Sequence, residues 1–226
     1  MLASIFNTFF PEICAACEQV LLQNEQVVCT HCMHKLPVIA NQEIAEEYIR
    51  DHFYGRIEIA HAGSLLYYQK KGLSQHLIHR LKYFGDERIS AFLGNWLAQY
   101  LLETDWAKTV DVVIPVPLHK NRKRKRGFNQ VSGFGQALAA NLNCAYDEES
   151  LIKIVDSRTQ VFKNRFARAE IKDAYFFLKD KDKIKGKHVL LVDDIITTGA
   201  TLESCAENLL KGDPSKISLL TMSIVV

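Results

Sequence analysis

The chain has 226 residues, of which 48% are hydrophobic and 24% carry a charge. This length suits one large domain, or one domain with a small module, and the apolar content is sufficient for a folded core. The 28 basic and 26 acidic residues give a net charge of +2, which indicates no bulk attraction to nucleic acid or membranes, so any basic surface must be local. Apolar runs such as 217–226 are too short to span a bilayer.

The amino-terminal sequence MLASIFNTFFPEI is apolar, but it lacks the basic flank and the small-residue cleavage site of a signal peptide. We therefore expect a cytoplasmic protein. Five apolar side chains of this sequence share one face of a helix, which favours a short amphipathic helix packed on the protein itself. These residues are Leu2, Ile5, Phe6, Phe9 and Phe10.

Two C-x-x-C pairs separated by eleven residues supply four clustered cysteines: Cys14, Cys17, Cys29 and Cys32. Each pair can form a tight knuckle, and two knuckles place four thiolates around a tetrahedral Zn²⁺. Disulfides are disfavoured in a reducing cytosol, and a redox C-x-x-C normally opens a helix in a βα unit. His31 or His34 is an alternative ligand in place of a cysteine. The sequence thus predicts an amino-terminal helix and a structural zinc knuckle within residues 1–37.

Residues 38–103 alternate between polar and periodic segments. Residues 38–56 are polar and charged, which suits a linker or a surface helix. Residues 57–68 are apolar and favour a strand pair or one long strand. Apolar residues at helical spacing predict a helix over 72–83, ended by Gly85, and a second helix over 88–103.

Strand and helix patterns alternate through the rest of the chain. Short apolar runs predict buried parallel strands, and the runs between them predict helices and one basic loop. This alternation implies a doubly wound, mainly parallel α/β sheet over residues 57–226, with sites at the carboxyl ends of its strands. The strands are expected at 111–116, 151–156, 189–192 and 217–226, the basic loop at 119–126, and the helices at 127–142 and 201–210.

The sequence LLVDDIITTGAT, residues 190–201, places two carboxylates, hydroxyls and a glycine between a buried strand and a helix. Free backbone amides at a helix amino terminus hold a phosphate, and Gly199 permits a close approach. Asp193 and Asp194 would repel that phosphate, so we expect them to face ribose hydroxyls or hydrated Mg²⁺. Helix capping is an alternative explanation, but it accounts for only one or two of these residues. The predicted cradle consists of Thr197, Thr198, Gly199, Ala200 and Thr201.

Residues 189–201 closely resemble the phosphoribosyl pyrophosphate (PRPP) binding motif of type I phosphoribosyltransferases. The order of the motifs along nearly the whole chain also resembles the ComF family of competence-associated proteins. These motifs are the four-cysteine knuckle, LKYFGD at 81–86, IPVP at 114–117, RGFNQ at 126–130 and the PRPP motif. The resemblance implies a type I phosphoribosyltransferase fold, a role in DNA uptake, and PRPP with Mg²⁺ as ligands.

The resemblance also implies roles for individual segments. The loop 197–201 would hold the 5-phosphate of PRPP, and Asp193 with Asp194 would bind the ribose 2- and 3-hydroxyls. The loop after Val116-Pro117 would contact pyrophosphate and Mg²⁺. The polar excursion at 157–173, long for a passive connection, would be a mobile hood over the reaction centre.

Phosphoribosyl transfer requires neutralisation of the departing pyrophosphate more than a protein nucleophile. Arg126 is the first candidate for this role because it adjoins the turn at 127–130, and Arg165 or Arg168 could act from the hood. A solvated basic surface is the alternative for each arginine. The sequence justifies only surface or supporting roles for three residues at the end of a predicted helix, Lys82, Tyr83 and Asp86.

The basic run also fits phosphates of single-stranded DNA, through Arg122, Lys123, Arg124 and Lys125. The function expected from these features is PRPP and Mg²⁺ binding by a protein of DNA uptake. An active phosphoribosyltransferase of nucleotide metabolism, with an unidentified acceptor, is the alternative. The sequence contains no ATPase signature, so any DNA-translocating ATPase would be a separate partner chain.

Overall fold

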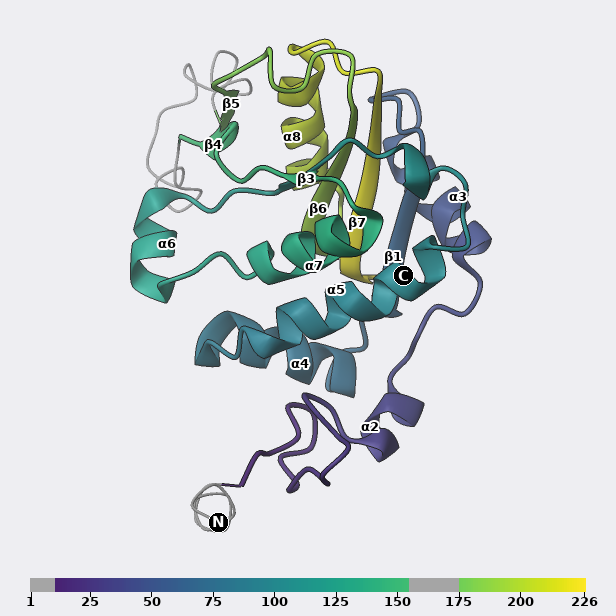
Figure 1. Cartoon of the computed structure of the whole chain (residues 1–226), viewed down its shortest axis with the longest axis vertical. Coiled ribbons are helices and arrows are strands. Elements are labelled where there is room, and N and C mark those ends of the chain that lie inside the picture. Colours follow the sequence, from purple (N-terminus) through teal and green to yellow (C-terminus); the bar gives the residue numbers. More distant parts are fainter. Residues whose placement is uncertain (1–10, 155–174) are drawn as a thin grey trace.

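The structure is a computed structural model that describes residues 11–154 and 175–226 (Figure 1). Its centre is a five-stranded parallel sheet with the strand order β1-β7-β6-β2-β3. The strands are β1 (Ala62–Tyr67), β2 (Val112–Pro115), β3 (Ala145–Tyr146), β6 (His188–Ile196) and β7 (Lys216–Ile224). The predicted doubly wound, mainly parallel α/β sheet is therefore confirmed.

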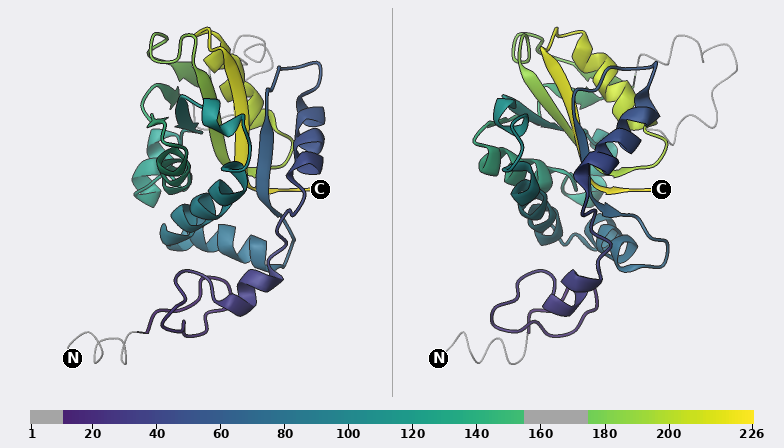
Figure 2. Two further views of the ribbon diagram at one scale, coloured as in Figure 1. Left: turned by 45° about the vertical axis from the view of Figure 1, so that its right-hand side comes forward. Right: turned by 90° about the vertical axis from the view of Figure 1, so that its right-hand side faces the viewer.

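Helices cover both faces of the sheet, as Figure 2 shows for α5 and α7 on one side and α3 and α8 on the other. The nine-residue strand β6 is buried on both faces because alternate side chains enter two separate cores. Leu190 and Val192 pack toward α4, α5 and α7, whereas Val189 and Leu191 pack toward α3 and α8. The helices are α3 (Gln42–Phe53), α4 (Leu73–Phe84), α5 (Arg88–Leu101), α7 (Ser132–Leu142) and α8 (Ala200–Leu210).

The direction of winding reverses between β2 and β6. From β2 the chain crosses through α7 to β3 on one side, and from β6 it crosses through α8 to β7 on the other. A crevice at the carboxyl ends of the strands is expected at such a reversal, and ligands of open α/β sheets bind there. The segments after β2 and β6 are therefore the ones that the fold places together.

Several element boundaries differ from the sequence predictions. The strand expected over 57–68 begins only at Ala62, and β4 (Leu151–Lys153) pairs antiparallel with β5 (Phe176–Leu178) outside the main sheet. The expected basic loop at 119–126 is wrong, because Lys120–Arg126 form helix α6. The His119 side chain caps this helix by accepting from the Asn121 N–H. The helix could not be predicted from periodicity, because its residues are all polar or charged.

The segment 38–56 contains α3, which begins after Asn41 and buries Ala45, Ile49 and Phe53. The Asn41 side chain accepts from the N–H groups of Glu43 and Ile44, which fixes the helix start. The shorter helices are α2 (Thr30–Lys35) and the 3₁₀ turn η1 (Ala107–Thr109).

Two predictions concern residues outside the described part of the chain: the amphipathic helix around Leu2–Phe10 and the hood at 157–173. Within the described residues, no helix combines the length and apolarity needed to cross a bilayer.

Candidate functional site

A chain of buried and partly buried polar contacts is centred on Asp194 of β6. The Lys82 ammonium lies 2.9 Å from Asp194 Oδ1, and the Gln130 amide donates to Oδ2 over 2.8 Å. Arg126 in turn donates to Oε1 of the Gln130 side chain over 2.8 Å. The Asp194 carboxylate is thus held on both oxygens by residues that are 112 and 64 positions away in the sequence.

Asp193 and Asp194 lie inside β6, which continues to Ile196, so both are more deeply buried than residues at a strand end. Their exposed fractions are only 9% and 4%. Asp193 Oδ1 accepts from the Asp194 N–H over 2.8 Å. Burial, and then the charge of Asp194, raise the pKa of Asp193 to about 8, against the opposing effects of that N–H and of Lys82 and Lys153. Asp193 is thereby a largely neutral acid at pH 7 in the free protein.

The variant Asp193→Asn should stabilise the folded protein at neutral and alkaline pH. A carboxyl with a folded pKa of about 8 and an unfolded value of 3.8 costs stability as the pH rises between these two values. Its neutral isostere removes that cost, so the free energy of unfolding should increase by on the order of 5 kcal/mol at pH 8 and should change little below pH ~4. Urea denaturation at both pH values measures this difference. An equal effect at both would contradict the assignment of a buried, neutral Asp193.

The turn at 127–130 positions Gln130 through buried side-chain contacts. Asn129 donates from its amide to the Val116 carbonyl over 3.1 Å and accepts from the Val131 N–H over 3.3 Å. The Ser90 hydroxyl of α5 donates to the backbone carbonyl of Gln130 over 2.6 Å. The turn is therefore tied to the end of β2 and to α5, which fixes the donors that reach Asp194.

The phosphate cradle predicted after β6 consists of a three-residue loop, 197–199, and the first two residues of α8, Ala200 and Thr201. Thr197, Thr198, Ala200 and Thr201 are exposed, whereas Gly199 is buried. Gly199 adopts φ +73° at the N-cap of the eleven-residue helix α8. The first N–H groups of this helix have no partner within the helix, and with the helix dipole they favour an anion at this end.

Gly199 is required by both conformation and space. A Cβ at this position would lie 2.9 Å from two atoms of the Phe53 ring in α3. Gly199→Ala should therefore lower the free energy of unfolding by about 1–3 kcal/mol and displace the loop. Gly186→Ala is the matched control, because Gly186 has φ +67° but open space around its Cβ position. Chemical denaturation should show a clearly larger loss for Gly199→Ala, and equal losses would contradict the steric argument.

The other predicted site residues lie in different places. Val116, at the end of β2, donates its N–H to Val192 and accepts from Asn129, so it adjoins the network, with Pro117 directly after it. Arg126 reaches the network through Gln130, and its guanidinium lies 5.7 Å from the centre of the Tyr83 ring. Arg165 and Arg168 lie outside the described residues.

Lys82 and Gln130 are the contacts that sequence reasoning missed. Lys82 was expected to have only a surface or supporting role, yet its ammonium touches the central carboxylate. The signal available in the sequence was the position of both residues within the quoted motifs LKYFGD and RGFNQ. Their contact with Asp194 could not be inferred, because it depends on how α4 and α7 pack on the sheet.

The four cysteines of the two C-x-x-C pairs converge in space. Their sulfur atoms all lie within 4.8 Å of one another, and Cys17 Sγ lies 3.8 Å from Cys29 Sγ. A tetrahedral zinc site with Zn–S bonds of about 2.3 Å separates its sulfurs by about 3.8 Å, so the cluster fits this metal. Cys14 Sγ also accepts from the N–H groups of Cys29 and Ala16. Burial raises the pKa of Cys14, but such N–H donors, first that of Cys29, outweigh burial and lower it to about 7.

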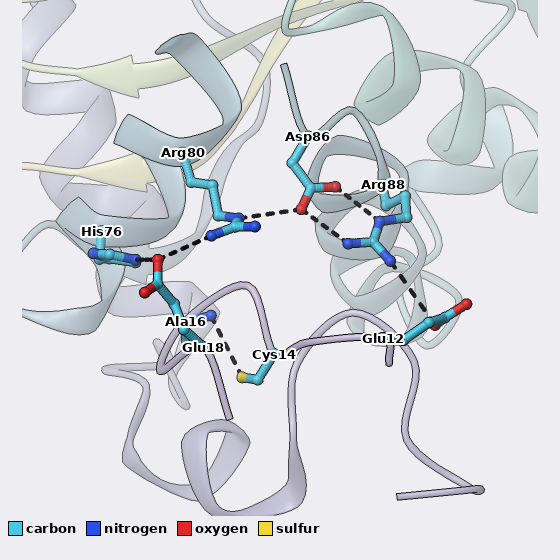
Figure 3. A network of polar contacts seen from close by, with 8 residues as sticks. All are labelled: Glu12, Cys14, Ala16, Glu18, His76, Arg80, Asp86 and Arg88. Carbon is cyan, nitrogen blue, oxygen red and sulfur yellow. Dashed lines mark hydrogen bonds and ion pairs between the residues drawn. The ribbon is translucent and has the colours of Figure 1, made fainter. Parts of the chain in front are cut away.

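An ion-pair network joins the segment of the four cysteines, residues 11–39 and here called the cysteine module, to α4 and α5 (Figure 3). Its centre is Asp86, which accepts from Arg80 over 3.3 Å and from two nitrogens of Arg88 over 2.9 and 3.0 Å. Arg80 also contacts Glu18 over 3.1 Å, and Arg88 lies 3.8 Å from Glu12. Hydrogen bonds from Arg88 outweigh burial and, with Arg80, hold the pKa of Asp86 below its usual value. The module is thus fixed to the helix that carries Lys82.

Comparisons with known proteins find a family model that matches the carboxyl-terminal part of the chain. Residues 132–222 match the family model described as phosphoribosyl transferase domain. The matched residues include Asp193, Asp194 and the loop before α8. A solved glutamine PRPP amidotransferase from B. subtilis, in complex with ADP and GMP, is similar at 19% identity with a TM-score of 0.45, covering 63% of this chain and 30% of that one.

Two relatives extend the similarity beyond this domain. Competence protein ComFC of Bacillus subtilis (strain 168) is 27% identical over 218 residues, which are 89% of this chain and 86% of the relative. DNA utilization protein YhgH of Escherichia coli O157:H7 is 31% identical over 147 residues, and the match spans about 63% of the length of each protein. The predicted resemblance to the ComF family is confirmed.

Proposed function

We propose that this protein binds PRPP together with Mg²⁺ at the carboxyl ends of β2 and β6. The observation that carries the proposal is the Asp194 carboxylate, which is held by Lys82 and Gln130 beside Asp193 and in front of the open amino terminus of α8. In this assignment the loop 197–201 binds the 5-phosphate. Asp193 and Asp194 bind the ribose hydroxyls.

The described residues supply charge neutralisation in the proposed complex. Asp194 exchanges Lys82 and Gln130 for ribose hydroxyls, which leaves the Lys82 ammonium and the Arg126 guanidinium available to the pyrophosphate. Carboxylates and substrate phosphates are the usual ligands of Mg²⁺, so Asp193 and Asp194 fit the ion as well as the sugar. Bound Mg²⁺ would neutralise negative charge on the pyrophosphate. Arg165 and Arg168 remain candidates for the same task.

Calorimetric titration of the full chain with PRPP tests this proposal. We expect saturable binding that is strongly reduced when Mg²⁺ is omitted, and a pyrophosphate assay on the same samples shows whether the bound PRPP reacts. Binding with release would favour the phosphoribosyltransferase alternative and start a search for the acceptor. Absence of binding in the presence of Mg²⁺ would contradict the proposal.

We further propose a role in DNA uptake, because relatives of this chain are named as competence and DNA utilization proteins. Helix α6 supports direct contact with single-stranded DNA. Six of its seven residues are basic, in the sequence KNRKRKR, and none is buried. Lys123 also contacts Glu148 over 3.2 Å, which attaches α6 to the rest of the protein. A cytoplasmic location, and a separate DNA-translocating ATPase as partner, belong to the same proposal.

Neutralising α6 should flatten the salt dependence of DNA binding. The variant with glutamine at Arg122, Lys123, Arg124 and Lys125 removes up to four phosphate contacts. The slope of log K against log salt for a single-stranded oligonucleotide should then decrease by roughly 2 to 3. Glutamine at Lys181, Lys183, Lys185 and Lys187, in the segment before β6, removes the same charge elsewhere and is the control. Fluorescence anisotropy at several salt concentrations measures both, and an unchanged slope would remove α6 from the interface.

We also propose that the four-cysteine cluster binds a structural zinc ion. Its sulfur spacing and the N–H donors to Cys14 support this assignment. The zinc would hold together a small segment that forms ion pairs with Arg80 of α4 and Arg88 of α5.

A further inference from the structure

A basic and aromatic groove of about 430 Å³ opens beside the Asp194 network. It is formed by two segments that are distant in the sequence, the end of α4 and the segment from α6 to the following turn. None of its lining residues is acidic. The lining residues are Lys82, Tyr83, Phe84, Gly85, Arg122, Lys125, Arg126 and Phe128.

The aromatic rings of this groove face solvent. Tyr83 is 68% exposed and Phe84 is 75% exposed, although large aromatic residues are usually buried. His79, one turn earlier on α4, lies 4.5 Å from the Tyr83 ring and 5.9 Å from the Phe84 ring, measured between ring centres. Rings beside a row of cations are typical of single-strand binding sites, where bases stack on the rings and phosphates contact the cations.

Two residues belong both to this groove and to the proposed PRPP site. Lys82 lines the groove while its ammonium contacts Asp194, and Arg126 lines the groove while it holds Gln130. When ribose hydroxyls donate to the Asp194 carboxylate, Lys82 and Arg126 can contact the pyrophosphate of PRPP instead. When a nucleic acid occupies the groove, the same cations can turn to its phosphates.

We propose that the groove binds single-stranded DNA with bases stacked on Tyr83 and Phe84, and that this DNA and PRPP weaken each other's binding. The inference rests on the proposed function, because it requires a PRPP site at Asp194. Both ligands are polyanions that compete for Lys82 and Arg126, so the interaction between them is unfavourable. Thermodynamic linkage requires the same factor of weakening in both directions.

The stacking surface is tested with a fluorescent oligo(dT) of about 12 nucleotides and the full chain. Tyr83→Ala with Phe84→Ala should weaken binding about tenfold, since stacking residues of such sites have effects of this size. Tyr54→Ala is the matched control, because Tyr54 is 87% exposed but lies after α3 and outside the groove. Equal binding by the double variant and the wild type would overturn the groove assignment.

Oligo(U) of the same length tests whether the ligand is DNA rather than RNA. Clearly tighter binding of oligo(U) than of oligo(dT) would overturn the assignment to DNA.

The linkage is measured by repeating the oligo(dT) titration in saturating PRPP and Mg²⁺, with Mg²⁺ alone as the reference. We expect the Kd for DNA to rise about fivefold or more, and the Kd for PRPP to rise by the same factor in saturating oligo(dT). In the double variant with asparagine at Asp193 and Asp194, PRPP at a concentration that saturates only the wild type should leave DNA binding unchanged. A shift there would show a general ionic effect and overturn the inference. If both ligands bind the wild type but ignore each other, the linkage is wrong while the proposed function stands. If PRPP does not bind the wild type at all, the proposed function is refuted, and the linkage is refuted with it.

Discussion

Replacing Asp193 and Asp194 together by asparagine should weaken PRPP binding by at least about 100-fold. Each hydrogen bond to a charged group contributes roughly 1.5–3 kcal/mol, and the double variant removes the Asp194 carboxylate together with the Asp193 carboxyl as acceptors for ribose hydroxyls. The phosphate loop and α8 remain intact, so some affinity for inorganic phosphate should persist. Calorimetry with PRPP and Mg²⁺ measures the loss directly.

The control for this experiment is Asp111→Asn. Asp111 also accepts a backbone hydrogen bond, from the His188 N–H over 2.8 Å, but it lies at the amino end of β2, away from the proposed site. Its PRPP affinity should equal that of the wild type. Circular dichroism must show that the double variant remains folded. A folded double variant that binds PRPP with undiminished affinity would refute the site assignment.

Removal of zinc should unfold the amino-terminal module and weaken the packing of α4 and α5. Structural zinc contributes about 10–16 kcal/mol in comparable peptides, because the metal-free segment is too small to fold alone. The module also contributes buried side chains, including Cys14, Val28 and Leu36, to the core that contains Leu77, Leu81 and Leu93. Cys17→Ser with Cys32→Ser should therefore lose the metal, lower the thermal midpoint and expose residues 11–39 to proteases.

Metal analysis of the purified proteins compares the zinc content of the wild type with that of the variants. The wild type should contain about one zinc per chain, as four cysteines define a single tetrahedral site. Cys144→Ser is the matched control, because Cys144 is half-buried and lies outside the cluster. This control should retain its zinc and its thermal midpoint. A wild type without stoichiometric metal would refute the zinc assignment.

The sequence predicted the sheet and most of its helices because their signals are local. Short apolar runs identified β2, β6 and β7, and helical spacing followed by Gly85 identified the end of α4, where Gly85 adopts the left-handed conformation. The helical state of 120–126 was missed. A continuous run of charges has no apolar periodicity, and the cap at His119 does not follow the common residue preferences.

The candidate site could be predicted only in part, for a related reason. Asp193, Asp194 and the loop before α8 are adjacent in sequence, so their shared chemistry is visible in one motif. The contacts of Lys82 and Gln130 with Asp194 span 112 and 64 positions and arise only when α4 and α7 pack on one face of the sheet. The groove has the same origin, since it joins the end of α4 to α6.

The most direct test of this account is a crystal structure of the full chain with PRPP and Mg²⁺. The account predicts the 5-phosphate at the backbone N–H groups of residues 197–201 and the ribose hydroxyls at Asp193 and Asp194. It also predicts that Lys82 no longer contacts Asp194 and points to the pyrophosphate. PRPP bound elsewhere on the chain, or bound with the Lys82–Asp194 pair intact, would contradict it.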